Sequence, residues 1–336
     1  MVDHTSEFMK YYSLLSIILL SNISVALAQG TLPHTFFNGK SVVFVSIDPS
    51  ARPVMTWIEV ADSVHNALVK AGADPVAYFE LEKVALSEAV QADYAKSFQQ
   101  RIVKNIILVT RQKNQMSIHV GPFSGNDQII PSTALFGVTG ENIGAVTSQF
   151  GQIGENQPTQ NLLVLDVPEF LKISSSETSS SQKFLTTNPL NLNVFKLGIT
   201  IEGSSGETGL LSYFRYDMYG KSPEAILSEQ AAQKAGIEQV LKQEYPHEIA
   251  WLTEAKSEQV LIRDRVQFLL VKVEGREADL MKSMGLEPKL DPSSSQIVVK
   301  YYIKLLVRDE LYIGPEWDAD PDWKVALNNF LQNLKK

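Results

Sequence analysis

Two Gly-Lys-Ser triplets have residue types and spacing that could do chemistry, because a glycine-rich turn followed by lysine can cradle a phosphate group. They lie at Gly39–Ser41 and Gly220–Ser222. The second triplet follows a predicted strand and precedes a predicted helix, whose first N–H groups would favour an anion. The full phosphate-loop signature needs another glycine upstream, and the corresponding positions hold His34 and Arg215. Alternatively, Ser222 simply serves as the N-cap of the helix that follows.

Charged residues at strand ends form the second group of candidates. In open α/β sheets, ligands bind beyond the carboxyl ends of the strands. This rule, together with the second triplet, selects the following candidate ligand-binding residues: Asp48, Arg52, Glu80, Arg111, Asp217, Lys221 and Ser222. They would form a small polar pocket for a carboxylate or a phosphate group. The alternative is that they are solvated loop residues and helix caps, as most charged residues at strand ends are.

Metal and acid–base chemistry have less support. The histidines lie far apart in the sequence and lack the spacing of a zinc site. Asp318, Asp320 and Asp322 alternate as at the start of a calcium loop. Trp323 and Asn329, however, stand where that loop needs glycine and glutamate. The Gly-x-Ser-x-Gly motif of serine hydrolases is also missing from the sequence. We therefore predict no metal site and no cofactor, and we assign no catalytic residue.

The C-terminal segment is rich in aromatic residues: Tyr301, Tyr302, Tyr312, Trp317 and Trp323. An exposed aromatic platform would suit a glycan or a protein partner, whereas burial in a core would explain the same residues. The exposure of these side chains distinguishes the two interpretations.

The elements that must position these residues alternate between strands and helices. For the first half, the apolar patterns predict strand 41–47, helix 53–72, strand 76–79, helix 87–104, and strands 105–110 and 116–120. For the second half, they predict strand 210–216, a helix from 223, strand 248–252, helix 253–265, strand 266–273, a β-rich run at 297–307 and a helix at 321–334. This order predicts an α/β fold with two units, each a mostly parallel or mixed sheet flanked by helices.

The two halves are similar enough to suggest a degenerate internal duplication. The interval from Pro53 to Pro75 nearly equals that from Pro223 to Pro246, although unrelated α/β domains often share such spacing. The serine-rich tract between the halves cannot bury enough apolar area to offset its ordering entropy. We therefore predict an N-terminal α/β domain, a linker or loop and a C-terminal α/β domain, with the boundaries 31–171, 172–189 and 190–336.

The N-terminal residues have the layout of a secretory signal. Met9 and Lys10 precede the apolar run Tyr11–Leu27, and small residues end the stretch near Ala28. We predict that residues 1–28 are a cleaved signal peptide with its true start at Met9. The alternative is a membrane anchor, although the apolar stretch falls short of the roughly 20 residues that span a bilayer. The predicted location is the periplasm or the cell exterior.

Composition narrows the class of protein. The chain contains no cysteine, which excludes a lipoprotein anchor and any disulfide. Beyond the predicted signal it has no Asn-x-Ser/Thr acceptor, and both absences suit a bacterial envelope. The net charge of −8 argues against nucleic acid and against anionic membrane surfaces as partners. After the predicted signal we find no apolar run that could span a bilayer, so the sequence predicts a soluble protein.

Two functional hypotheses follow. The first is an exported, non-catalytic binding or assembly module of the bacterial envelope, whose partner is another envelope protein or a small anionic ligand. The second is a periplasmic hydrolase, or a nucleotide- or phosphate-binding enzyme that uses strand-end carboxylates and the Gly220–Ser222 loop. The second requires Asp48, Glu80, Asp217 and Lys221 to converge in one pocket.

Overall fold

The structure of the chain is a computed structural model. It describes residues 30–131, 133–173, 183–204, 211, 222–288, 296–308 and 310–335. The predicted signal peptide, the serine-rich tract and two candidate residues, Asp217 and Lys221, lie outside these ranges, as does the predicted strand 210–216 apart from Leu211.

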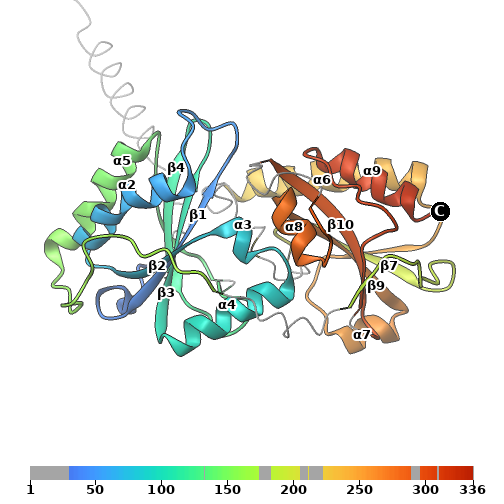
Figure 1. The fold of residues 1–336 in the computed structure, drawn as a ribbon, viewed down its shortest axis with the longest axis horizontal. Coiled ribbons are helices and arrows are strands. Elements are labelled where there is room, and N and C mark those ends of the chain that lie inside the picture. Colours follow the sequence, from blue (N-terminus) through green and yellow to red (C-terminus); the bar gives the residue numbers. More distant parts are fainter. Residues whose placement is uncertain are drawn as a thin grey trace, which may run out of the picture.

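The first unit is built on a five-stranded mixed sheet in the order β2-β1-β3-β4-β5 (Figure 1). β1, β2 and β3 are parallel, whereas β4 and β5 each run antiparallel to the preceding strand. The strands are β1 Lys40–Ile47, β2 Asp74–Glu80, β3 Val103–Arg111, β4 Met116–Pro122 and β5 Phe136–Gly140.

Helices cover both faces of this sheet, which explains the near-continuous apolar sequence of β1. Val43 and Val45 pack into one core cluster with α2 and α5, while Val42 and Phe44 pack on the other face with α3 and α4. The helices are α2 Trp57–Lys70, α3 Leu81–Val84, α4 Glu88–Gln100 and α5 Ile143–Gly151, with short 3₁₀ turns η1 His34–Phe37 and η2 Gln152–Asn156.

The first helix begins later than the sequence predicted. Pro53 does not open it, because the start is fixed at Thr56 by a reciprocal capping box. The Thr56 hydroxyl accepts a hydrogen bond from the Glu59 N–H at 3.2 Å, and the Glu59 carboxylate accepts one from the Thr56 N–H at 2.6 Å. The predicted end is confirmed: the helix stops at Lys70, and Gly72 has a φ of 100°, which favours glycine.

The second unit contains a six-stranded sheet in the order β6-β11-β10-β9-β7-β8. Its strands are β6 Lys183–Leu185, β7 Lys196–Thr200, β8 Ile249–Leu252, β9 Val266–Arg276, β10 Ile297–Leu305 and β11 Glu310–Tyr312. One face carries α6 Pro223–Glu244 and α9 Trp323–Asn333, and the other carries α7 Glu258–Arg263 and α8 Glu277–Ser283. The sequence placed residues 183–185 in the linker, but they pair with β11 and extend this sheet.

Both units share one connectivity. β7, β8, β9, β10 and β11 repeat the order and directions of β1, β2, β3, β4 and β5, with β6 as an additional edge strand. The first and last helices of each unit also pack against each other, α2 with α5 and α6 with α9. The strand that corresponds to β1 is β7, which the sequence analysis did not predict. This is the arrangement that an internal duplication would produce.

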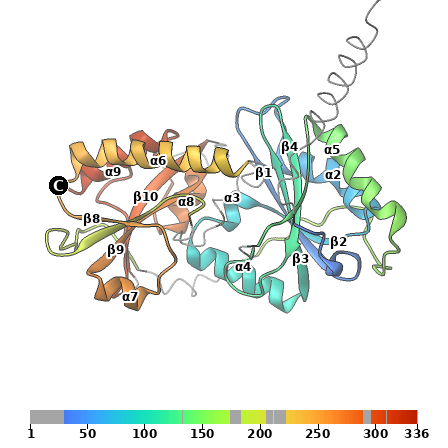
Figure 2. The ribbon, with the colours of Figure 1, turned by 180° about the vertical axis from the view of Figure 1, so that it is seen from behind.

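The two units lie side by side, and α3 contacts β9 (Figures 1 and 2). The Arg276 guanidinium donates two hydrogen bonds to the buried Glu80 carboxylate, one of them at 2.7 Å. Lys304 Nζ donates to Glu88 Oε2 at 2.8 Å, and Leu86 packs against the apolar cluster of the second unit. The α/β fold with two units, as predicted, is therefore joined by both charged and apolar contacts. Within the described ranges, none of the helices is long and apolar enough to cross a membrane.

Candidate functional site

A cavity of about 260 Å³ opens at the carboxyl end of β3. Three parts of the first unit line it: the connection from β1 to α2, the turn from β3 to β4, and the start of α5. These are the ends of β1 and β3, which are neighbours in the sheet; the chain passes from β1 to α2 on one face, whereas β3 turns directly into β4. In α/β folds this position is the usual place for a ligand.

Arg111, the last residue of β3, is the most unusual group in the cavity wall. It shares a sheet face with Val109, and its side chain is only 6% exposed. Its Nη2 donates to the Pro53 carbonyl at 2.6 Å, but its Nη1 is buried and has no hydrogen-bond partner among the residues that the structure describes. Burial lowers the pKa of Arg111, yet an arginine remains charged at neutral pH.

An unpaired, buried donor is costly. Leaving such a group unsatisfied costs about 1–3 kcal/mol, and more when the group is charged. Buried polar atoms without partners are rare in folded proteins and each needs a physical explanation. A bound acceptor that completes the hydrogen bonding of Arg111 would provide one.

The start of α5 adds backbone donors to the same cavity. Asn142 caps the helix, and its Oδ1 accepts a hydrogen bond from the Ala145 N–H at 3.0 Å. Ile143 and Gly144, which also line the cavity, occupy the first helical turn, where N–H groups have no acceptor within the helix. The partial positive charge of a helix N-terminus favours a bound anion.

The charged side chains of the cavity are predominantly basic. Arg52, Arg111 and Lys113 line it, opposed by Glu141. Arg52 is exposed and is held in place by its Nη1, which donates to the Pro49 and Ala51 carbonyls at 2.9 and 2.8 Å. In a chain with a net charge of −8, a local excess of positive charge creates a potential that attracts small anions.

Of the candidates predicted from sequence, Arg52 and Arg111 are brought together in this cavity. Asp48 lies beside Arg111, since its N–H donates to the Arg111 carbonyl at 2.8 Å, but its carboxylate accepts from the Ser50 N–H as a turn cap. Ser222 caps α6 and accepts from the Ala225 N–H at 3.2 Å, as the alternative interpretation of the second triplet held. Asp217 and Lys221 lie outside the described residues.

Glu80 belongs to a different environment. It is 5% exposed and faces Arg276 of the second unit. Burial and the nearby Glu82 raise the pKa of Glu80 to about 7, against the opposing charge of Arg276. Glu82 is buried as well, and its Oε1 accepts a hydrogen bond from the Ser46 hydroxyl at 2.6 Å. Glu80 therefore helps to join the two units, whereas the hydrogen bond of Glu82 to Ser46 lies within the first unit.

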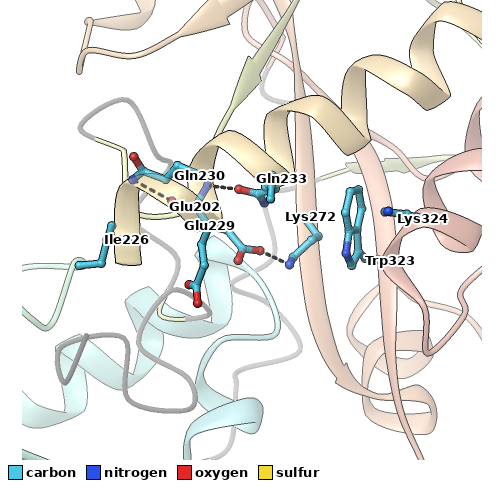
Figure 3. A pocket seen from close by; sticks show the side chains of 9 residues that line it. Glu202, Ile226, Glu229, Gln230, Gln233, Lys272, Trp323 and Lys324 are labelled. Atoms are coloured by element: carbon cyan, nitrogen blue, oxygen red, sulfur yellow. Dashed lines mark hydrogen bonds and ion pairs between the residues drawn. The ribbon is translucent and has the colours of Figure 1, made fainter. Parts of the chain in front are cut away.

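A second cavity, of about 380 Å³, occupies the corresponding position in the second unit (Figure 3). It is lined by Glu202 after β7, by α6, by Lys272 of β9 and by the start of α9. Its polar groups pair with one another, because Lys272 forms an ion pair with Glu202. The Glu202 N–H also donates to Gln233 Oε1 at 3.1 Å, and Gln230 Nε2 donates to the Glu202 carbonyl at 3.3 Å.

The metal-binding and aromatic candidates of the sequence analysis are the remaining groups to place in the structure. Within the described parts of the chain, no three histidine, aspartate or glutamate side chains cluster as metal ligands. Asp318 does not stand in a calcium loop, since its Oδ1 accepts from the buried Lys300 Nζ at 2.6 Å. Tyr301, Tyr302 and Tyr312 are each at most 3% exposed, so these members of the aromatic segment belong to the core.

Lys113, Glu141 and Asn142 are among the lining residues of the basic cavity that the sequence analysis did not select. A signal for the last existed, because an asparagine precedes apolar residues at helical spacing, Ile143, Val146 and Phe150. Nothing in the sequence indicated that the turn after β3 and the start of this helix would share one cavity.

Comparisons with known proteins found no match of the chain to a protein-family model, to a curated protein or to a solved structure.

Proposed function

We propose that this protein is an exported, non-catalytic binding module that holds a small anionic ligand in the cavity at the end of β3. The observation that carries the proposal is Arg111, a buried residue of the cavity wall whose Nη1 has no partner among the described residues. Two other basic side chains and a helix N-terminus line the same cavity. The signal-like sequence of residues 1–28 supports the proposal of export, with the periplasm or the cell exterior as the proposed location.

The alternative, an enzyme that uses strand-end carboxylates, has weaker support. Neither Asp48 nor Glu80 is among the residues that line the basic cavity. Asp48 caps a turn, and Glu80 is engaged by Arg276. The cavity has three basic side chains and a single carboxylate, Glu141, in its wall, which suits the binding of an anion better than acid–base catalysis by paired carboxylates.

A thermal-shift measurement tests the proposal. Inorganic phosphate, sulfate and acetate are each compared with chloride at constant ionic strength, using the purified protein. A ligand at 100 times its dissociation constant stabilises the folded state by about 2.7 kcal/mol. We expect at least one of the three anions to raise the melting temperature of the wild-type protein, and Arg111→Gln to abolish that rise.

The control is Arg101→Gln, which removes an exposed arginine beyond the opposite end of the same strand. It changes net charge equally, so a specific site predicts that it keeps the anion response. Circular dichroism checks that both variants are folded. An equal response of the wild-type protein and Arg111→Gln, or no response to any of the anions, would refute the proposal.

A further inference from the structure

The donors around the cavity at the end of β3 define the kind of anion that fits, an inference that rests on the proposed function. The Nη2 of Arg111 donates one of its two N–H groups to the Pro53 carbonyl, and its Nη1 has no partner among the described residues. A carboxylate is best bound by two parallel N–H groups of one arginine. Here one N–H of the guanidinium is engaged by a backbone carbonyl.

The remaining donors come from separate elements and therefore approach from different directions. Arg111 ends β3, Lys113 lies in the following turn, and the first N–H groups of α5 lie around Gly144. A tetrahedral group presents oxygens in several directions, whereas a planar carboxylate presents two in one plane. Helix N-termini that meet basic side chains are a common arrangement for binding phosphate.

The net charge of the side chains that line the cavity also favours a phosphate over a carboxylate. Arg52, Arg111 and Lys113 face a single carboxylate, that of Glu141, so the lining side chains leave two positive charges uncompensated. A phosphate monoester carries a charge of about −1.5 to −2 at neutral pH, because its second pKa is about 6. A simple carboxylate would neutralise only one of these charges.

Size and apolar lining indicate that the ligand is more than a bare ion. The cavity of about 260 Å³ is also bounded by Pro53, Met55 and Ile143, and the last two are partly buried against the core of the unit. Ligand sites typically combine such an apolar wall with a few polar groups that fix orientation. The wall would pack against the carbon part of an ester.

The second unit provides an internal comparison. Its cavity at the corresponding position has two acidic and two basic lining side chains, Glu202 and Glu229 with Lys272 and Lys324. The shared topology therefore does not by itself produce a basic cavity. Of the two cavities, that of the first unit has the positive excess and, among the described residues, an arginine whose Nη1 has no partner.

We infer that the cavity at the end of β3 binds a small phosphate monoester, with its phosphate at Arg111 and at the start of α5. Isothermal titration of the purified protein with phenyl phosphate, inorganic phosphate and benzoate tests this at constant ionic strength and pH 8. We expect phenyl phosphate to bind at least about tenfold more tightly than benzoate, which corresponds to about 1.4 kcal/mol. It should also bind more tightly than inorganic phosphate, because only the ester uses the apolar wall.

The two variants and the three ligands distinguish a failure of the phosphate inference from a failure of the proposed function. Arg111→Gln should lose phenyl phosphate binding, and Arg101→Gln should retain it. If benzoate binds as tightly as phenyl phosphate, the inference of a phosphate is wrong while the proposed anion site stands. If inorganic phosphate binds as tightly as its ester, the role of the apolar wall is overturned. If none of the three binds, both the inference and the proposed function fail.

Discussion

A buried ion pair in the second unit gives the sharpest test of how that unit is stabilised. Lys300 of β10 donates to Asp318 Oδ1 at 2.6 Å, and the two side chains are 0% and 4% exposed. Asn333 of α9 donates to Asp318 Oδ2 at 2.9 Å. Burial lowers the pKa of Lys300 and raises that of Asp318, while each partner opposes the effect of burial on the other.

Lys300→Met removes the cationic partner and leaves the Asp318 carboxylate buried with neutral donors, among them the Asn333 amide. Breaking a buried pair in this way costs about 3–5 kcal/mol, because the remaining charge is uncompensated. Removing both charges, in Lys300→Met with Asp318→Asn, should recover most of that loss, since a neutral replacement of a buried pair is often tolerated. The two sites are in direct contact, so their effects should be strongly non-additive.

Urea unfolding followed by tryptophan fluorescence measures these free energies. The matched control is Lys335→Met, which breaks an ion pair of similar length, 2.7 Å to Glu244, whose lysine is 51% exposed. Exposed pairs contribute about 0–1 kcal/mol, so this variant should unfold nearly as the wild-type protein does. A loss for Lys300→Met no larger than that of the control, or a double variant no more stable than Lys300→Met, would refute the reasoning.

Two further predictions concern the first unit. The folded state favours protonated Glu80, whose pKa is raised from 4.5 to about 7, so its stabilising contribution is complete below pH 4.5 and is lost as pH rises toward 7. This loss amounts to roughly 3 kcal/mol at 1.36 kcal/mol per pKa unit. Unfolding free energies measured between pH 4.5 and 7.5 should therefore fall less in Glu80→Gln than in the wild-type protein, and parallel curves would contradict the assignment. Thr56→Ala removes the capping box of α2 and should lower the unfolding free energy by about 1 kcal/mol, whereas an unchanged urea midpoint would contradict that role.

Much of the fold could be predicted because the burial of an element determines the pattern of apolar residues in its sequence. β1 is covered on both faces and has a continuous apolar run, and α6 begins where a serine cap precedes Pro223. The predicted strand at 266–273 lies within β9. Such elements carry their own signals, since a cap or an apolar run depends on neighbouring residues.

Short elements and element ends were harder to predict. β11 has three residues and β7 has five, too few for a clear period. Helix α4 stops at Gln100, earlier than the predicted end at 104, because the chain reverses at Ile102 with a φ of 59°. An isoleucine in the sequence does not indicate a positive φ, because that backbone conformation is uncommon for a β-branched residue.

The candidate site could be predicted only in part, for a related reason. The strand-end rule selected Arg52 and Arg111 correctly as cavity neighbours, because the ends of parallel strands meet at one edge of a sheet. The same rule selected Glu80, yet that side chain is engaged by an arginine from the other unit, 196 residues away in the sequence. An ion pair between the two units depends on how the two sheets are placed against each other, and a local sequence pattern does not predict that placement.

The two units show that one topology can give two cavities whose lining side chains differ in net charge. In both, the first strand, the third strand and the last helix converge on a cavity. In the second unit Glu202 neutralises Lys272, so the protein supplies its own anion. In the first unit the connection after β1 supplies Arg52 and the Pro53 carbonyl instead. Glu141 is the single carboxylate among the lining side chains, against three basic ones. This positive excess is the ground on which we propose that the cavity of the first unit takes an anion from outside the chain.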